Sequence, residues 1–228
     1  MKRIRKAARV MSVIVAAILT ALVVTVLCAQ EGDRIALTEA FDGLSDREEP
    51  GRQIDWDSLP AEVVAWVEVP GTGIDEPIVQ ATPDSPNAYL YRDVFGQGAN
   101  GTPYIDSECS IDSRLVMVYG HRMSDGTAFA EFADYIDEGY AREHSSIIVY
   151  KRSGETLVLE VCAVDVVNAS RERLVIDQDD AFEKIVEAAD LQLSDPTEAE
   201  QLCAFTTCSY QTWNSRTVVY ACMTNVAR

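Results

Sequence analysis

A cysteine, an arginine and a histidine each stand at the end of an apolar, strand-like segment, and together they could carry out acyl transfer. Cys208 ends the run 202–207, and Arg216 begins the run 217–221. Two antiparallel strands joined by the polar loop between these runs would place Cys208 and Arg216 side by side. His121 follows a third apolar run and a glycine. A thiol, an imidazole and a guanidinium in one cleft would supply a nucleophile, a proton carrier and an oxyanion partner.

Each of these residues also has a plainer structural explanation when it is taken alone. A single cysteine is more often a buried structural residue, and an arginine at a strand end is more often a solvated charge. The second histidine, His144, lies in a polar stretch and is expected to be exposed. Two histidines without a Cys-x-x-Cys pair predict no zinc site. The glycine-rich loop 96–101 lacks a Gly-Lys-Ser/Thr ending, so we expect neither a nucleotide nor another cofactor.

Three motifs together resemble the sortase family of surface transpeptidases. They are the Tyr-Gly-His triplet that ends at His121, the Thr-Thr-Cys triplet that ends at Cys208, and Arg216 eight residues after the cysteine. The stretch AWVEVPGTGIDEPIVQ, residues 65–80, is similar as well, and the resemblance extends from about residue 55 to the C-terminus. It is nearest to class B, because a long helical segment is expected before the cysteine strand. Three residues depart from the usual class B pattern, namely Arg122, Glu76 and Thr206.

The resemblance implies a mainly β fold with peripheral helices, built as a closed barrel of about eight strands. It implies a cysteine transpeptidase that cleaves a C-terminal sorting signal of the Asn-Pro-x-Thr type through a thioester to Cys208. The surface protein carrying that signal would then be joined to an amine of the cell-wall peptide or of a pilin lysine. Catalysis would involve His121, Cys208 and Arg216, and the peptide groove would be lined by Leu90, Tyr119, Thr206 and Thr207.

Hydrophobic periodicity places the surrounding elements. Strands are expected at 66–69, 74–80, 104–106, 115–119, 147–150 and 156–167, with a hairpin turn at 152–155. A short helix is expected at 61–66, with Trp66 filling the core. A second helix should bury the stripe Phe129, Phe132 and Ile136, and a third, at 179–193, should border the groove.

The first 30 residues predict a membrane anchor. Five basic residues precede the uncharged run 10–29, which is long enough to span the ~30 Å hydrocarbon core as a helix. An apolar run of this length favours a retained anchor over a cleaved signal peptide. Basic residues on the cytoplasmic side place the remaining chain outside the cell. We therefore predict an anchor at 1–30, a stalk at 31–54 and a catalytic domain at 55–228.

The outer part of the chain is strongly acidic. Residues 31–228 carry 14 basic residues against 37 acidic ones, a net charge of −23. Such a surface disfavours nucleic acid as a partner. The expected partners are instead the sorting-signal protein, the amine acceptor and the membrane.

Two questions stay open at this level. Five cysteines lie beyond the anchor, Cys109, Cys162, Cys203, Cys208 and Cys222, and the sequence does not decide whether any of them pair. The same nucleophile could also serve a surface cysteine peptidase or hydrolase, and a barrel without an active site could serve as a membrane-anchored binding module. Product analysis and the reactivity of Cys208 would separate these alternatives.

Overall fold

The computed structural model describes residues 52–95, 101–168, 182–196, 199–209 and 214–224. The predicted anchor lies outside these ranges, as does the predicted stalk apart from Arg52–Ile54. By its contacts the chain divides at Ile54 and Asp55, and the fold that follows belongs to the second unit, Asp55–Arg228. Across the described ranges, no helix combines the length and the apolar character needed to cross a membrane.

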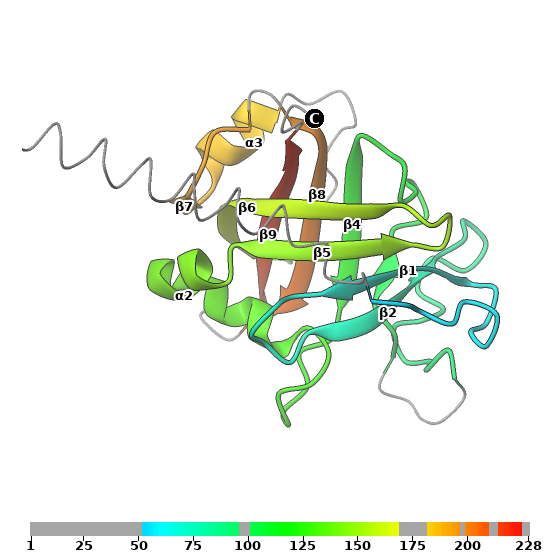
Figure 1. Cartoon of the computed structure of the whole chain (residues 1–228). Coiled ribbons are helices and arrows are strands. Elements are labelled where there is room, and N and C mark those ends of the chain that lie inside the picture. Colours follow the sequence, from blue (N-terminus) through cyan, green and yellow to red (C-terminus); the bar gives the residue numbers. More distant parts are fainter. Residues whose placement is uncertain (1–51, 96–100, 169–181, 197–198, 210–213, 225–228) are drawn as a thin grey trace, which may run out of the picture. The chain divides into compact units, whose positions relative to one another are not determined.

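Eight strands of the second unit close into a barrel, as predicted. The pairing order is β5-β1-β2-β3-β4-β8-β9-β6, and β6 pairs back to β5 (Figure 1). The short strand β7 attaches to β6. The strands are β1 (Val63–Glu68), β2 (Asp75–Gln80), β3 (Tyr104–Ile105), β4 (Leu115–Gly120), β5 (Ser146–Lys151), β6 (Thr156–Asn168), β7 (Leu191–Gln192), β8 (Ala199–Cys208) and β9 (Ser215–Thr224).

Two apolar clusters lie on the two faces of the barrel wall. The interior cluster contains Val118, Phe205 and Val219, and it is closed by aromatic side chains of the 3-10 helix η1 (Ala130–Ile136). The outer cluster contains Met117, Ala204 and Val218, and it is covered by α3 (Phe182–Ala188). A third helix, α2 (Glu138–Glu143), begins at Asp137, whose side chain accepts a hydrogen bond from the amide of Tyr140. Apolar side chains on both faces explain why β4, β8 and β9 read as continuous apolar runs.

The helix expected at 61–66 is wrong, because this segment is strand β1. Its burial alternates with a period of two, with Val63, Ala65 and Val67 buried. β1 pairs with β2 and β5, and consecutive β-branched residues favour this extended state. Trp66 therefore does not fill the core; it lies on the opposite face, where its indole N–H donates to Asp75 Oδ1 at 2.6 Å.

The predicted stripe around Phe129 is correct in part. Phe129 and Phe132 are fully buried, but Ile136 is 37% exposed and Tyr135 takes its place in the core. The reason is the helix type: a 3-10 helix has three residues per turn, so positions 129, 132 and 135 share one face. Burial of both Phe132 and Ile136, four residues apart, would have required an α-helix.

The helix expected at 179–193 is shorter, and it lies elsewhere than predicted. Within the described part it covers Phe182–Ala188, and β7 follows immediately. Arg114, which precedes β4, places its guanidinium 3.7 Å from the centre of the Phe182 ring. Figure 1 shows α3 near the start of β8, away from the arrowhead that carries Cys208. The helix therefore packs at the far end of the strands rather than beside the groove.

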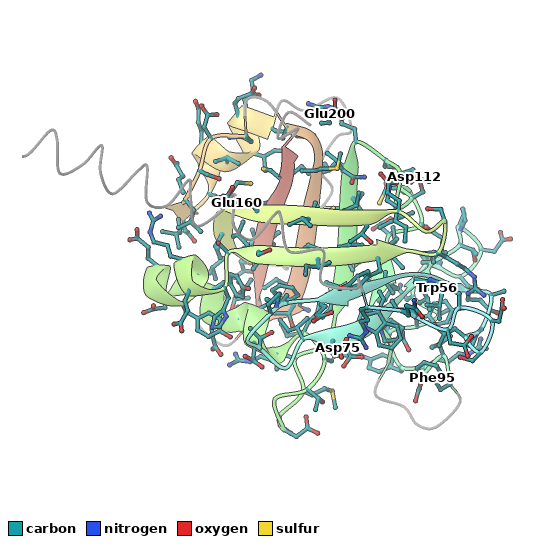
Figure 2. The ribbon with its side chains drawn as sticks, in the orientation of Figure 1. Trp56, Asp75, Phe95, Asp112, Glu160 and Glu200 are labelled. Atoms are coloured by element: carbon teal, nitrogen blue, oxygen red, sulfur yellow. The ribbon has the colours of Figure 1, made fainter. Side chains whose placement is uncertain are left out.

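One arginine fastens the segment that leads into the barrel. Arg152, in the turn after β5, donates to four backbone carbonyls, those of Trp56, Leu59, Pro60 and Val63, at 2.7–3.5 Å. Trp56 is labelled in Figure 2 within this entering segment. Five N–H donors on a rigid guanidinium allow such multiple bonding, and a lysine could not reproduce it.

Candidate active site

Backbone register alone brings the three predicted catalytic residues to one end of the barrel. Cys208 and Arg216 are direct partners in the antiparallel pair β8–β9. In the parallel pair β4–β8, Gly120 faces Thr207, so His121 and Cys208 are the next residues along their two strands. Sequence reasoning predicted this meeting from strand ends; the pairing of β4 with β8 supplies its basis.

Alternation along the strands places the relevant side chains on one face. Thr206 and Cys208 are two residues apart on β8, and the same step separates Tyr119 from His121. Residues two apart on a strand point to the same side, as do directly opposed residues on neighbouring strands. Since Tyr119 is opposite Thr206 and Arg216 is opposite Cys208, all five belong to the outer face of the sheet.

A cavity of about 380 Å³ lies at this end of the outer face. All seven residues predicted from the sequence line it: Leu90, Tyr119, His121, Thr206, Thr207, Cys208 and Arg216. The thiol of Cys208 is half-buried, and so are the side chains of His121 and Arg216. The structure thus brings the predicted residues together, while their catalytic and binding roles stay predictions.

The imidazole of His121 is positioned by contacts with the segment that precedes β3. Its Nε2 contacts the carbonyl oxygen of Leu90, and its ring lies 5.6 Å from that of Tyr91. A carbonyl oxygen can only accept, so a hydrogen bond here assigns a proton to Nε2, and in the neutral tautomer Nδ1 is then the nitrogen with the free electron pair. Gly101 makes this approach possible: its φ is +74°, and a Cβ there would lie 2.9 Å from His121 Cδ2.

The guanidinium of Arg216 is oriented by its neighbours on β9. One of its terminal nitrogens donates to Asn214 Oδ1 at 3.2 Å and to the carbonyl oxygen of Ser215 at 3.1 Å. Five N–H donors leave this group with further capacity to bind an oxyanion or a peptide carbonyl. Ser215 is itself held by Ser209, whose hydroxyl lies 2.9 Å from that of Ser215.

The family model for the Sortase domain matches residues 67–224, which is more than half of the chain and includes all three residues. The chain belongs to the sortase family. It is similar to sortase B of Listeria monocytogenes serovar 1/2a, with 28% identity over 94 residues, 40% of this chain and 37% of the Listeria protein. The chain therefore matches little more than a third of the length of that curated relative.

Solved structures agree on the fold and on the class. Sortase B of B. anthracis, in a complex with AAEK2, has 26% identity and a TM-score of 0.60, covering 71% of this chain and 77% of that one. A class B sortase of Streptococcus pyogenes involved in pilus biogenesis has a TM-score of 0.63 at 22% identity, covering 74% and 97%. The latter likeness concerns the fold alone. This sortase is thus class B-like.

Sequence reasoning missed a polar pair on the floor of the sortase cavity. Tyr119 is hydrogen-bonded to Asp106, and both line the cavity with Tyr104. Burial, followed by the charge of Asp106, raises the pKa of the Tyr119 hydroxyl, which therefore stays protonated and donates to the carboxylate. The available signal was the two-residue step from Tyr104 to Asp106 in the expected strand, which places both side chains on one face. The approach of Asp106 to Tyr119 depends on the pairing of β3 with β4.

The hydroxyl of Thr206, a cavity residue that is 2% exposed, has no hydrogen-bond partner among the described residues. A buried hydroxyl without a partner costs free energy, so it would gain from a polar group placed in the cavity. Thr207 and Thr217 are directly opposed, and their side chains lie on the interior face of the sheet. Their hydroxyls also have no partner in the described part of the chain.

His121 also borders a second, smaller hollow of about 190 Å³. Two carboxylates, Glu76 and Asp93, face it. Burial raises the pKa of Glu76, and the nearby charges of Asp75 and Asp93 raise it further, whereas a backbone hydrogen bond from Ala128 lowers it. Glu76, which departs from the usual class B residue, thus lines the second hollow, which His121 also borders, and not the larger cavity.

Proposed function

We propose that this sortase is a cysteine transpeptidase that cleaves a C-terminal sorting signal of the Asn-Pro-x-Thr type. The proposal rests on one observation: a thiol, an imidazole and a guanidinium line the same cavity at the ends of β4, β8 and β9. Cys208 attacks the carbonyl carbon of the threonine, and the peptide C–N bond breaks to leave a thioester. An amine then attacks the thioester, forms a new amide and releases Cys208 as a thiol.

In these steps His121 transfers the protons and Arg216 stabilises the negative charge. His121 takes the thiol proton of Cys208 at Nδ1, because Nε2 is already bonded to the Leu90 carbonyl, and delivers it to the departing amine. In the second step it takes a proton from the incoming amine and returns it to the Cys208 sulfur. Arg216 stabilises the oxyanion that develops on the threonine carbonyl, a contribution that reaches ~10²–10³ in rate for one donor. Thr206, Thr207, Tyr119 and Leu90 bind the peptide chain.

The second substrate in this proposal is an amine of the cell-wall peptide or of a pilin lysine. The described part of the chain does not favour one acceptor over the other. The Streptococcus pyogenes relative is involved in pilus biogenesis, which makes a lysine acceptor a reasonable first test. A short peptide carrying a free lysine and a short wall-type peptide would compete for the same thioester.

Mass spectrometry after tryptic digestion tests the first half-reaction. The full chain is mixed with a peptide that contains Asn-Pro-x-Thr, and we expect an added mass on the tryptic peptide that carries Cys208. The Cys208→Ala variant should show no adduct. Adding an amine should convert the adduct into an amide product. Free acid as the sole product, in the presence of a saturating amine, would indicate a hydrolase instead.

Thiol labelling tests the non-catalytic alternative. Cys109 is a suitable reference, because it is half-buried and its pKa is raised, mainly by burial. We expect iodoacetamide to modify Cys208 faster than Cys109, and replacement of His121 by alanine to change the rate at Cys208. Equal rates at both cysteines, unaffected by His121→Ala, would support a binding module without catalysis.

We also propose that residues 1–30 anchor the enzyme in the cell membrane, with the domain 55–228 outside the cell. This rests on the uncharged run 10–29 behind a basic flank. Enzyme, membrane-retained substrate and wall precursor would then meet at one surface. Fractionation tests the proposal: the full chain should sediment with membranes, and deletion of residues 1–30 should release it.

A further inference from the structure

We propose that Cys162 and Cys222 form a disulfide that joins β6 to β9 beneath α3. The two sulfur atoms lie 2.6 Å apart, with the Cys222 thiol directed at the Cys162 sulfur. A disulfide bond is ~2.05 Å long, so bonding requires the atoms to approach by only about half an ångström. The bond would be separate from the chemistry proposed for Cys208, and it does not depend on the proposed transpeptidase activity.

A bulge in β6 produces this contact. Glu160 pairs with Cys222 and Val161 with Ala221, but the register then shifts, and Ala163 pairs with Tyr220. Cys162 is thus the extra residue on its strand. Such a residue bends the strand and redirects its side chain. As a result the Cys162 sulfur reaches both the Tyr220 carbonyl oxygen, at 3.4 Å, and the Cys222 sulfur.

The surroundings of the pair are apolar and closed. Cys162 is 0% exposed and Cys222 is 2% exposed. Both belong to the outer cluster that includes Phe182 and Val186 of α3. A disulfide carries no charge and loses two weak donors, so it fits this environment at least as well as two thiols do.

The other three cysteines in the described part of the chain are directed elsewhere. Cys203 is opposite Ala221 and belongs to the interior cluster, on the other side of the sheet from Cys222. Cys109 precedes β4, and its sulfur lies 3.4 Å from the amide nitrogen of Met117 within that strand. Cys208 lines the cavity at the opposite end of β8. The geometry therefore selects one pair and leaves Cys208 as a thiol.

The reaction is thiol–disulfide exchange with a small-molecule or protein disulfide. The two thiols lose two protons and two electrons and gain one S–S bond, while the external disulfide is reduced to two thiols. Exchange requires a thiolate, and the hydrogen bond shared with Cys222, together with burial, raises the pKa of Cys162 in the folded chain. The bond should therefore form while the chain folds, before α3 covers the pair.

Peptide mapping tests the pairing directly. The full chain is unfolded, reduced and refolded in a buffer of reduced and oxidised glutathione; free thiols are then blocked and the protein is digested with trypsin. Cys162 and Cys222 fall on separate peptides, 153–171 and 217–228, whereas Cys203 and Cys208 share the peptide 185–216. We expect the first two peptides to be linked. Both peptides recovered with blocked thiols, or either one linked to 185–216, would overturn the proposal.

Thermal unfolding with and without a reductant supplies an independent readout. The cysteines are sixty residues apart, and closing a loop of this size predicts a Tm lower by on the order of 10 °C after reduction. Cys222→Ala should abolish this difference. Cys203→Ala, a buried cysteine on the other face, should retain it. If Cys222→Ala does not fold, peptide mapping of the unsubstituted protein still decides the question. An unsubstituted protein whose Tm is the same with and without reductant would contradict the proposal.

Discussion

Cys208 and Arg216 are directly opposed residues on β8 and β9, so their proximity is set by the sheet itself. The strands extend from this pair to Ala199 and Thr224 at their far ends. A side-chain substitution at either position leaves this backbone pairing intact. Losses of activity at these two positions can therefore be read as losses of chemistry rather than of folding.

Arg216→Lys should lower kcat by ~10²–10³ while the Tm stays within ~2 °C. Lysine keeps the charge but loses the planar set of donors that can bind a carbonyl oxygen and its own strand together. The measurement is turnover of a sorting-signal peptide at saturating amine. Arg142→Lys is the matched control, because Arg142 is an exposed member of a surface ion pair with Glu138. Unchanged turnover in Arg216→Lys would remove this residue from the site.

Thr206→Val should raise stability and lower activity at the same time. The mutation removes a buried hydroxyl that has no partner, a change of about 1 kcal/mol in favour of folding, or ~2–4 °C in Tm. If the hydroxyl binds the peptide, kcat/KM should fall by ~10-fold, from the loss of one hydrogen bond. Thr217→Val is the control: it should raise the Tm similarly and leave kcat/KM unchanged. A Thr206→Val enzyme with full kcat/KM would exclude Thr206 from substrate binding.

Glu76→Gln should stabilise the protein at neutral pH but not at low pH. The pKa of Glu76 is raised in the folded state, mainly by burial. Below the pKa of the unfolded chain the carboxyl is protonated in both states and has no effect. As the pH rises through the folded pKa, the charged form carries a desolvation penalty that glutamine avoids. Urea unfolding from pH 3 to pH 8 measures the difference.

Asp125→Asn provides a control of opposite sign for this pH series. Hydrogen bonds from Thr127 lower the pKa of Asp125, so its charge favours folding above the unfolded pKa, and that benefit disappears as the pH falls. The asparagine variant should therefore lose stability at neutral pH only. A Glu76→Gln gain of equal size at pH 3 and pH 8 would show that the carboxylate charge is not its cause.

Gly120→Ala should destabilise the barrel and impair His121. A Cβ at this position would overlap the buried ring of Phe129. Overpacking of this kind costs ~1–3 kcal/mol and displaces the neighbouring backbone. Because His121 follows directly, we expect a lower kcat as well as a lower Tm, measured by peptide turnover and calorimetry.

Phe129→Ala tests the cause of that effect, because alanine lacks the Cγ and Cδ2 atoms that the new methyl group would overlap. If the overlap is responsible, the double variant should be more stable than the sum of the two single changes predicts. Gly154→Ala is the reference: a Cβ there meets no atom within 4 Å, so the strain at its φ of +96° should lower the Tm and leave kcat unchanged. Strict additivity of Gly120→Ala and Phe129→Ala would exclude the steric explanation.

The strands that end at the site could be predicted from the sequence because apolar runs are short-range signals, whereas the closed barrel was expected from the resemblance to the sortase family. The apolar runs before His121 and Cys208 appear in the structure as β4 and β8, with bounds close to those expected. The helix expected at 61–66 is wrong because the alternating burial of Val63 and Ala65 depends on strands β2 and β5. Such pairing partners are distant in the chain and are not visible in a local pattern.

Other features depended on contacts that no local pattern encodes. After Phe132, the next buried residue is Tyr135, three positions on, and not Ile136, four positions on, because Tyr135 packs into the interior of the barrel. The position of α3 follows from the outer cluster and from Arg114, not from its place before the cysteine strand. The approach of Cys162 to Cys222 needs a bulge that shifts the register by one residue.

The four carbonyl groups gathered by Arg152 determine where this protein can be shortened. All four lie upstream of the family match, which begins at Val67. A fragment cut at the start of that match would leave the guanidinium without these acceptors and would remove most of β1, one of the two strands that pair with β5. The smallest autonomous folding unit must therefore start no later than Trp56. Expression boundaries should include all four carbonyl groups bound by Arg152 and should not follow the start of the family match.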